Sequence, residues 1–280
     1  MLNLNDDFIR QKLVNQMYVD LDKFCINEFK EEPRNHLGVS ILGNDCKAQI
    51  WGAFRWLKQE SLDGRQYRLF NRGHLEETRF VRWLRGMGFV VEEFDEDGKQ
   101  FRISGVNGHF GGSLDGRAWR EDTGKLLVEF KTHNDRSFKK LKKEKLRKSK
   151  PVHYAQMCSY GVAKGFDFGL YAAVNKNDDD IYIEIVNLER DEGDFLFARA
   201  ENIINSQTQP QKIAQTETYF DCKYCAQKGI CFRGEAPDVN CRSCRNAFPV
   251  ENASWACAVH NAIIPEHIIK VGCSSYTRII

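Results

Sequence analysis

The amino-acid sequence predicts an α/β fold, in which a mixed central sheet carries helices on both faces, followed by a cysteine-rich C-terminal appendage. Short strand-like segments alternate with amphipathic helical segments between residues 71 and 205, and such alternation is typical of a sheet covered by helices. Seven of the ten cysteines follow residue 221. A chain of 280 residues can bury one sizeable core with an appendage, or two modest domains.

Composition excludes several classes of protein. The hydrophobic fraction of 42% is ordinary for a globular chain, and no run of about 18 apolar residues predicts a membrane span. The N-terminus, MLNLNDDFIRQ, lacks a basic and then apolar signal pattern, so we expect a cytoplasmic protein. In that compartment ten cysteines indicate metal ligation rather than disulfides. The net charge of +2 is uninformative because the basic residues are locally concentrated.

Three helices are expected before the strands begin, and the first two lie in the N-terminal part. Residues 4–29 predict a helix, and its apolar stripe consists of Phe8, Leu13, Met17, Leu21 and Phe24. Residues 44–59 predict a second helix, capped by Asn44 or Asp45, with Cys46 in its first turn.

A third helix is predicted over residues 71–88, and Phe80 and Leu84 would pack it against the sheet. His74 and Glu77 lie one turn apart on it and therefore share a face. They are candidates for a site, although ordinary surface charges give the same pattern.

The stretch from Gly111 to Lys131 predicts two strands joined by a turn at residues 121–124. Because side chains alternate along a strand, Glu129 and Lys131 leave the same face, and Val128 and Phe130 leave the other. Asp115, on the first strand, would come alongside them. Two carboxylates beside an ammonium group suit a divalent cation and a phosphate. The alternative is an exposed face with a cross-strand ion pair.

Further strands are predicted at residues 89–94, 101–104, 169–174 and 181–186, and a helix at 194–205. Four glycines crowd the approach to Asp115, and they either let a ligand come close or mark a bulge: Gly105, Gly108, Gly111 and Gly112.

A basic run follows Lys131. Residues 136–150 contain nine basic residues and one acidic residue. Such a run is commonly a solvated surface, but here it would hold a phosphate backbone without sequence preference, in part as a mobile loop that orders on DNA. The candidate DNA-binding residues are Lys139, Lys140, Lys142, Lys143, Lys145, Arg147, Lys148 and Lys150. Pro151 then begins a predicted helix that presents Gln156 and Tyr160 on one face.

The ordered set Asp115, Glu129-x-Lys131 and Gln156-x-x-x-Tyr160 resembles the PD-(D/E)XK nucleases, in their RecB-like and lambda-exonuclease-like branch. The resemblance implies a restriction-endonuclease-like core and a metal-dependent exonuclease of DNA. Asp115, Glu129 and the backbone carbonyl of Phe130 would hold Mg²⁺ or Mn²⁺. Gly73-x-x-x-Glu77 resembles the GxxxE/H element of this branch, so Glu77 or His74 would support the metal. Gln156 and Tyr160 would help to hold the DNA strand.

The first cysteine cluster, Cys222-x2-Cys225-x5-Cys231, is one ligand short of a metal site. It resembles the trio of the iron–sulfur members of this branch, which include CRISPR-adaptation nucleases, and phage recombination exonucleases are further relatives. In those iron–sulfur members a single upstream cysteine completes the set, and Cys46 stands in that place. The resemblance implies a [4Fe–4S] cluster, although four thiolates also suit zinc.

The second cysteine cluster has the spacing of a small zinc ribbon. It begins with Cys241-x2-Cys244 and continues with Cys257. The fourth ligand is either Cys273, which would leave no orphan thiol, or His260, which lies nearer to Cys257 in the sequence. Because the appendage is too small to bury a core, zinc would supply its folding energy.

These observations predict an N-terminal helical segment (1–43), a nuclease domain closed by the first cysteine cluster (44–232) and a zinc-ribbon-like tail (233–280). The predicted function is exonuclease action in phage or bacterial DNA recombination or repair, without a helicase motif in the chain. DNA, single-stranded or at duplex ends, is the expected partner, and an annealing protein and further copies of the chain are additional candidates. The alternative is a nucleic-acid-binding module with zinc sites and no turnover.

Overall fold

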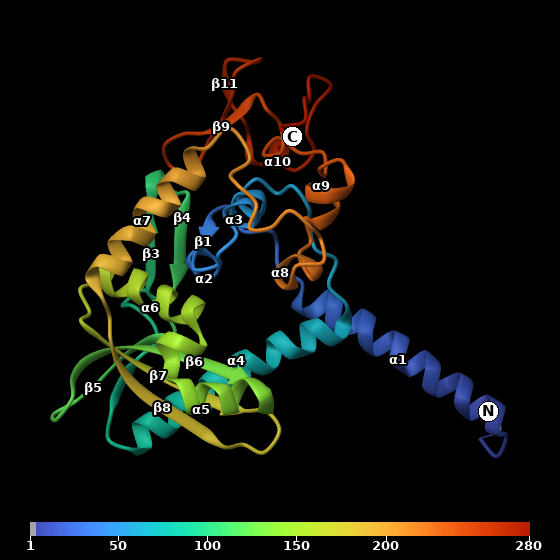
Figure 1. The fold of residues 1–280 in the computed structure, drawn as a ribbon. Coiled ribbons are helices and arrows are strands. Elements are labelled where there is room, and N and C mark those ends of the chain that lie inside the picture. The colour runs from blue at the N-terminus through green and yellow to red at the C-terminus, as the bar shows by residue number, and fades with distance from the viewer. Residues whose placement is uncertain (1–3) are drawn as a thin grey trace.

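The computed structural model describes residues 4–280, and its centre is a mixed five-stranded sheet (Figure 1). The strand order is β2-β5-β6-β7-β8, with bounds Val90–Glu92, Gly116–Arg120, Gly124–His133, Phe168–Asn175 and Ile181–Asn187. Strands β6 and β7 are parallel, and every other neighbouring pair in this sheet is antiparallel. The predicted mixed sheet is therefore confirmed.

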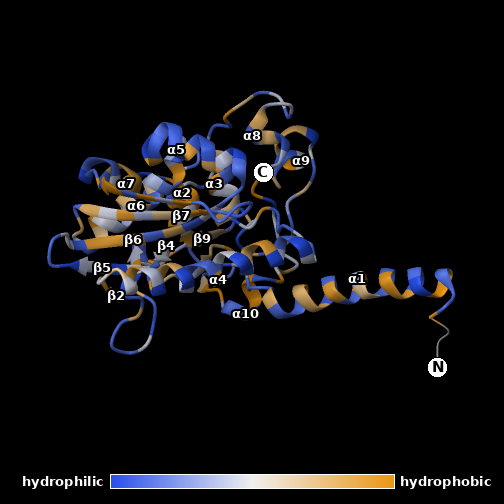
Figure 2. Cartoon of the chain, turned by 90° about the horizontal axis from the view of Figure 1, so that it is seen from below, coloured by the Kyte–Doolittle hydropathy of each residue, from blue (hydrophilic) through white to orange (hydrophobic). Residues whose placement is uncertain are grey.

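Helices cover both faces of this sheet, as predicted. On one face, Phe80 and Leu84 of α4 (Gly64–Gly86) pack against Val128 and Phe130 of β6. On the other face lie α5 (Asp135–Ser149) and α6 (Pro151–Lys164), and α7 (Arg190–Asn205) packs against α6. Strand β7 between the two layers is largely apolar, whereas β6 mixes apolar and polar residues (Figure 2). Because side chains alternate along β6, its two faces contribute to two separate clusters of buried residues.

The helical boundaries differ from the prediction in two places. Helix α4 begins at Gly64, not near residue 71, because Asp63 and Gln66 form a capping box that starts it earlier. Helix α3 (Lys47–Phe54) has Cys46 as its N-cap, without a side-chain capping bond. The expected capping role of Asn44 or Asp45 was wrong, and Cys46 lies just outside the first turn.

The N-terminal part consists of α1 (Asp7–Phe29), which is capped by Asp6, and then β1 (Leu37–Gly38) and α2 (Val39–Leu42). A second, three-stranded sheet has the order β1-β4-β3. Its other strands are β3 (Arg102–Gly105) and β4 (Phe110–Ser113), which are joined by the 3₁₀ turn η1 (Val106–Gly108).

The prediction of two strands between Gly111 and Lys131 was wrong in its first half. Three strands cross this stretch, because β4 ends at Ser113 and β5 begins at Gly116. Asp115 lies in the bend between these strands, where the chain passes from the small sheet to the central one. The carboxylate is therefore at the junction of the two sheets.

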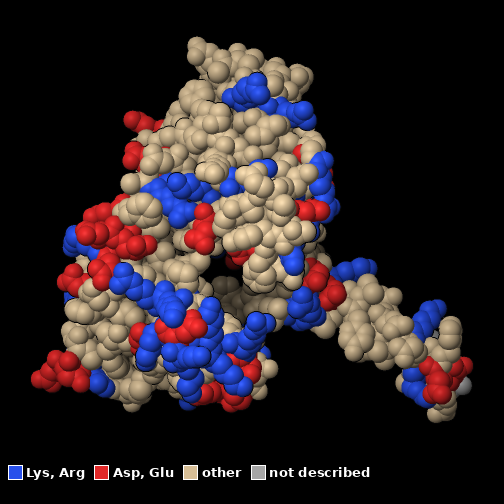
Figure 3. Space-filling model, in the orientation of Figure 1, with Lys and Arg blue, Asp and Glu red and all other residues tan. Residues whose placement is uncertain are grey.

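The basic run is helical rather than a loop, because Leu141 and Leu146 of α5 are buried in the core. Asn134 caps this helix by accepting a hydrogen bond from the Ser137 backbone N–H. Lys145 has a positive φ of 65° and breaks the helical geometry near the end. Figure 3 shows Lys and Arg side chains gathered over α5.

The cysteine-rich part follows α7 and forms the end of the molecule opposite the central sheet (Figure 1). It contains two short helices, a small antiparallel sheet of order β11-β10-β9 and a last short helix. Their bounds are α8 (Phe220–Lys223), α9 (Lys228–Arg233), β9 (Ala247–Pro249), β10 (Trp255–Cys257), β11 (Ala262–Ile263) and α10 (Glu266–Ile269).

This C-terminal part packs on the segment around α3. The rings of Phe54 and Trp255 lie 5.3 Å apart, and the buried guanidinium of Arg242 stacks on Phe54, Trp56 and Trp255. Both ends of the chain thus contribute to one cluster of buried side chains. Within residues 4–280, no helix combines the length and the apolar character that crossing a bilayer requires.

Candidate active site

Asp115, Glu129 and Lys131 meet at the end of the central hairpin. The register pairs Gly116 with Val128, so the bend that carries Asp115 comes next to Glu129. The Asp115 Oδ2 atom accepts a hydrogen bond of 2.7 Å from the backbone N–H of Phe130. The Lys131 ammonium donates to Oε1 of Glu129. The three side chains that the sequence placed together are therefore in contact or adjacent.

Burial makes the charges of this group strongly interdependent. Glu129 is 0% exposed, and its Oε2 atom has no hydrogen-bond partner among the described residues. Burial raises the pKa of Glu129, and Asp115 and Glu77 raise it further, against the opposing effect of Lys131. Burial alone would lower the pKa of Lys131, but the carboxylates of Glu129, Asp115 and Glu77 outweigh burial and raise it. The lysine is therefore a permanent cation.

Helix α4 brings Glu77 toward the same group. Burial, and then the nearby Asp115 carboxylate, raise the pKa of Glu77, while His74 and Lys131 oppose this shift. His74 Nδ1 lies 3.6 Å from Glu77 Oε1, but its side chain is 66% exposed. Glu77 thus belongs to the same acidic group as Asp115 and Glu129. His74 contacts this group through its pairing with Glu77.

Tyr160 of α6 lies within electrostatic range of Glu129 and Asp115, and Gln156 is its neighbour one helical turn earlier. Both are buried, and they share a hydrogen bond that lowers the pKa of Tyr160 against the dominant effect of burial, which raises it. The Tyr160 hydroxyl donates to the Ser113 carbonyl at 2.8 Å. A Cβ atom on Gly112 would lie 2.6 Å from that hydroxyl, so Gly112 makes room for Tyr160.

A cleft of about 680 Å³ opens beside these residues. Its walls come from the end of α1 and the segment after it, from α4, and from β6 at Phe130, Lys131 and Thr132. Figure 3 shows an opening between the part that carries the central sheet and the cysteine-rich part. Two residues that the sequence did not single out also line the cleft: Arg34 and Glu76. Glu76 is buried and paired with Arg79 at 2.7 Å.

The sequence also missed a polar cluster next to Lys131. The Tyr171 hydroxyl lies 2.8 Å from His133 Nε2 and 2.9 Å from His153 Nδ1, and Lys150 bonds Ser137, which contacts His133. Strand periodicity offered a signal, because His133 shares a face with Glu129 and Lys131. His153, by contrast, arrives from another element.

Many of the basic residues of α5 are engaged within the chain. Lys139 pairs with Asp135, Lys140 with Glu144, Lys142 with Asp180 and Arg147 with Glu189. Lys145 lies over the ring of Tyr182. Among residues 4–280, Lys143 and Lys148 have no ion-pair partner. The basic surface therefore carries less net charge than its sequence suggests.

The cysteines of the first predicted set lie around the start of α3 and in the cysteine-rich part. Cys46 lies at the start of α3, Cys222 in α8 and Cys231 in α9. Burial raises the pKa values of Cys222, Cys225 and Cys231, and the thiol of Cys46 adds to each shift. Four thiols from elements up to 185 residues apart in the sequence are thus within electrostatic range of one another.

The second cysteine set also converges. Cys241, Cys244, Cys257 and Cys273 line one small cavity of about 20 Å³, which is room for about one water-sized particle. His260 does not line that cavity, and its Nε2 atom lies 3.8 Å from Cys273 Sγ. No group of three or more His, Cys, Asp or Glu side chains within residues 4–280 forms a ready-made metal site. The metal assignments therefore stay predictions.

Comparisons with known proteins give structural neighbours at low identity. The structure named SSO0001 is 17% identical, with a TM-score of 0.47, over 77% of this chain and 96% of that chain. An alkaline exonuclease from Laribacter hongkongensis, LHK-Exo, is 16% identical, with a TM-score of 0.45, over 61% of this chain and 87% of that one. The same exonuclease in complex with dAMP is also a neighbour, with a TM-score of 0.43. No family model and no curated protein matches the sequence.

Proposed function

We propose that this chain is a metal-dependent DNA nuclease that hydrolyses phosphodiester bonds, most simply as an exonuclease. One observation carries the proposal: Asp115, Glu129 and Lys131 meet beside a cleft that Lys131 and Glu77 line. One buried carboxylate oxygen, Glu129 Oε2, has no partner in the described chain. An unpartnered buried carboxylate oxygen is costly. A divalent cation at this position would remove that cost.

The residues present fit such a cation. Asp115, Glu129 and the Phe130 carbonyl supply hard oxygen ligands of the kind that Mg²⁺ and Mn²⁺ prefer, and Glu77, or His74 in its place, would support them. Burial raises the pKa values of Glu77 and Glu129, and the neighbouring Asp115 carboxylate raises both further, so a bound cation would relieve repulsion among these carboxylates. When bound, the cation would lower the pKa of a water molecule and stabilise charge on the scissile phosphate.

The remaining roles belong to side chains of the chain itself. Lys131 stays charged, so it can orient the attacking water or neutralise charge on the phosphate. Tyr160, which lies within electrostatic range of Asp115 and Glu129, and its hydrogen-bond partner Gln156 would help to hold the strand. Lys143 and Lys148 are free to contact phosphates, whereas Lys139, Lys142 and Arg147 would first have to leave their partners. The expected biological setting is cytoplasmic DNA recombination or repair in a phage or bacterium.

We propose further that the two cysteine sets bind metals. Cys46, Cys222, Cys225 and Cys231 would hold a [4Fe–4S] cluster, with zinc as the alternative. Cys241, Cys244, Cys257 and Cys273 would hold zinc, because these four residues and not His260 line the small cavity. In this arrangement 44–232 would act as the nuclease domain and 233–280 as a metal-stabilised tail.

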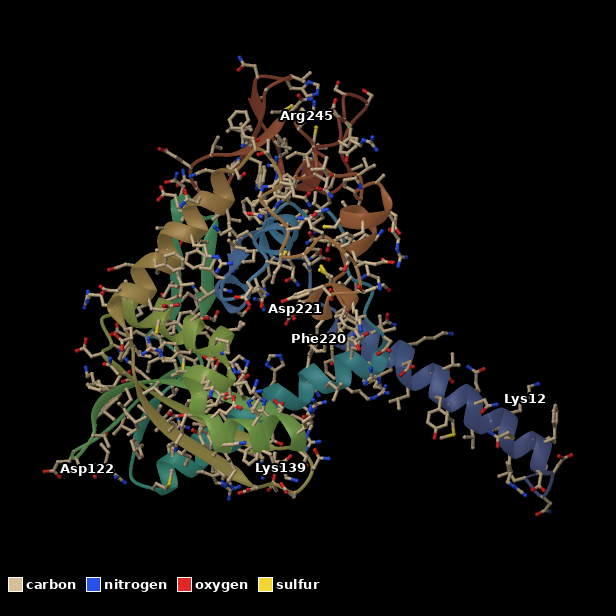
Figure 4. The ribbon with its side chains drawn as sticks, viewed as in Figure 1. Lys12, Asp122, Lys139, Phe220, Asp221 and Arg245 are labelled. Atoms are coloured by element: carbon tan, nitrogen blue, oxygen red, sulfur yellow. The ribbon has the colours of Figure 1, made fainter. Side chains whose placement is uncertain are left out.

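The test is cleavage of end-labelled linear DNA against closed circular DNA in Mg²⁺ or Mn²⁺. We expect the wild type to degrade only the linear DNA and Lys131→Ala to lose about 10²–10³-fold in rate. The matched control is Lys12→Ala, which removes an exposed lysine near the free end of α1, away from the central sheet (Figure 4), and should cut normally. Equal rates for Lys131→Ala and wild type would remove Lys131 from the mechanism. No cleavage by a cluster-loaded wild type would favour the binding module instead.

A further inference from the structure

Two arginine side chains are buried where the cysteine-rich part meets α3 (Figure 1). Arg55, the C-cap of α3, is 0% exposed, and Arg242 of the tail is 1% exposed. Their hydrogen bonds go to backbone carbonyls, to that of Ala247 from Arg55 and to those of Arg34 and Asn35 from Arg242. Within residues 4–280, neither guanidinium forms an ion pair, and the Nε and Nη2 atoms of both lack a hydrogen-bond partner.

The surroundings of these guanidiniums compensate only part of the unfavourable energy of their burial. Both lie over the ring of Trp255, and the distances to its centroid are 5.1 Å for Arg55 and 4.9 Å for Arg242. The two like charges also repel each other. Cation–π contacts are weaker than the energy needed to remove an ion from water. Two buried cations of this kind call for negative charge nearby.

The second cysteine set lies next to Arg55. Ala247, which accepts the 3.0 Å hydrogen bond from Arg55, lines the same small cavity as the four cysteines of this set. Its backbone N–H donates to the Cys244 carbonyl at 3.3 Å, and its strand β9 pairs it with Cys257 of β10. Burial lowers the pKa of Arg55 to about 10, and Cys244 opposes this shift. The guanidinium and the thiols are thus neighbours through Ala247.

Metal binding would supply the missing negative charge. Thiols are neutral, whereas cysteines that bind a metal are thiolates. Four thiolates around one divalent cation leave two net negative charges, and these match the two buried guanidiniums. With His260 in place of Cys273, only one net negative charge would remain. The arginines therefore favour the four-cysteine set.

We propose that Arg55 and Arg242 are the counter-cations of a four-thiolate metal centre in the tail, so that binding of a divalent metal holds the tail on α3. This inference rests on the proposed zinc set and is independent of the nuclease site. Arg55 is a positioning residue and not a ligand. It acts through its charge and through its hydrogen bond to Ala247, the residue that contacts both Cys244 and Cys257.

The zinc affinity of the full chain, measured by competition with a chromophoric chelator, tests this role. Arg55→Met removes the charge but keeps a long side chain, and it should weaken zinc binding about 10–100-fold. Arg55→Lys keeps the charge and should bind zinc within about threefold of the wild type. The matched control is Arg85→Met, which makes the same change in α4, at an arginine paired with Glu93, and should leave zinc affinity unaltered.

Urea denaturation with and without zinc separates the effect of charge from that of packing. In the zinc-loaded protein, Arg55→Met should lower the midpoint, because the metal centre loses a counter-cation. In the zinc-free full chain it should not, because there the substitution removes a cation that has no counter-charge. An equal loss in both forms would show that Arg55 serves only to pack against Trp255, and it would overturn the proposal.

Three further outcomes would also overturn it. Wild-type zinc affinity in both Arg55→Met and Arg242→Met would remove the arginines from the metal centre. A wild type that binds no more zinc than Cys257→Ser has no metal centre in the tail, a result that leaves DNA cleavage, measured separately, unaffected. Weak zinc binding by a folded Arg55→Lys would contradict a role for charge, and this variant remains decisive even if Arg55→Met does not fold.

Discussion

At the scale of one residue, Glu129 combines complete burial with a carboxylate oxygen that lacks a hydrogen-bond partner. It lies on a fully buried strand position between apolar neighbours, yet it keeps one oxygen without a partner. Burial of such a group opposes stability, and sites that do chemistry commonly carry this kind of conflict. Asp115, Glu129 and Lys131 could be predicted because strand alternation is a local rule. The bend that holds Asp115 could not, since it depends on two sheets meeting.

The contact between Gly112 and Tyr160 gives a prediction at this scale. Gly112→Ala places a Cβ atom 2.6 Å from the Tyr160 hydroxyl oxygen, so we expect a loss of about 1–3 kcal/mol in the free energy of unfolding. Tyr160→Phe removes that oxygen together with its hydrogen bonds to the Ser113 carbonyl and to Gln156. Because the clash disappears with it, the double variant should be clearly more stable than the sum of the single effects. Urea denaturation measures the cycle, and strict additivity would contradict this packing.

The buried histidines predict a pH dependence of stability. Burial, followed by Lys150 and Lys131, lowers the pKa of His133 to about 4. Burial, followed by Lys131 and His133, lowers the pKa of His153 to about 3. In the unfolded chain a histidine titrates near 6.5. Below that pH the unfolded state therefore binds protons at these histidines, whereas the folded state does not. The free energy of unfolding should therefore fall between about pH 6.5 and 4, by up to about 1.4 kcal/mol per pH unit for each histidine.

Chemical denaturation at pH 7, 6 and 5 measures this slope. His153→Asn keeps a polar group near Tyr171 but cannot take up a proton, so the share of the slope that His153 contributes should disappear, while the shares of His133 and of the other buried histidines remain. If the variant kept the full slope of the wild type, other groups would be responsible for the acid sensitivity, and His153 would be protonated equally in both states.

At the scale of elements, sequence periodicity predicted most helices and strands, but it did not predict which of these elements pack against one another. Burial of Val128 and Phe130 against α4 follows from the alternation along β6. The basic run was expected to be a mobile loop in part, but Leu141 and Leu146 anchor it as α5. The composition of this run shows mainly its repeated lysines and so conceals its apolar stripe. The spacing of Leu141 and Leu146 along the sequence would have indicated the stripe. The apolar stripe of α1, by contrast, was predicted and is exposed.

The first cysteine set links α3 to α8 and α9, and Cys46 tests that link. Cys46→Ser should abolish absorbance near 400 nm and cluster iron, and it should lower the melting temperature by several degrees, because bound metal supplies folding energy. Cys25→Ser, which alters a buried cysteine outside both sets, should keep its iron. Zinc in place of iron, or full iron in Cys46→Ser, would contradict the cluster assignment.

At the scale of the whole molecule, the least predictable feature is that the two ends of the chain share a core. Arg242 stacks on Phe54 and Trp56, and Arg55 donates to the Ala247 carbonyl at 3.0 Å. These contacts join residues about 190 positions apart, and no local pattern reports them. Sequence spacing identified the cysteines of the tail, but it could not show which surface the tail covers.

The central claim is that the acidic group at the cleft binds a catalytic divalent cation, and calorimetric titration of Mn²⁺ tests it most directly. The wild type should bind Mn²⁺ in the micromolar to millimolar range, and its cleavage rate should saturate over the same concentrations. Glu129→Gln, with its folding verified, should lose both binding and cleavage. Undiminished Mn²⁺ binding and cleavage by Glu129→Gln would contradict the account.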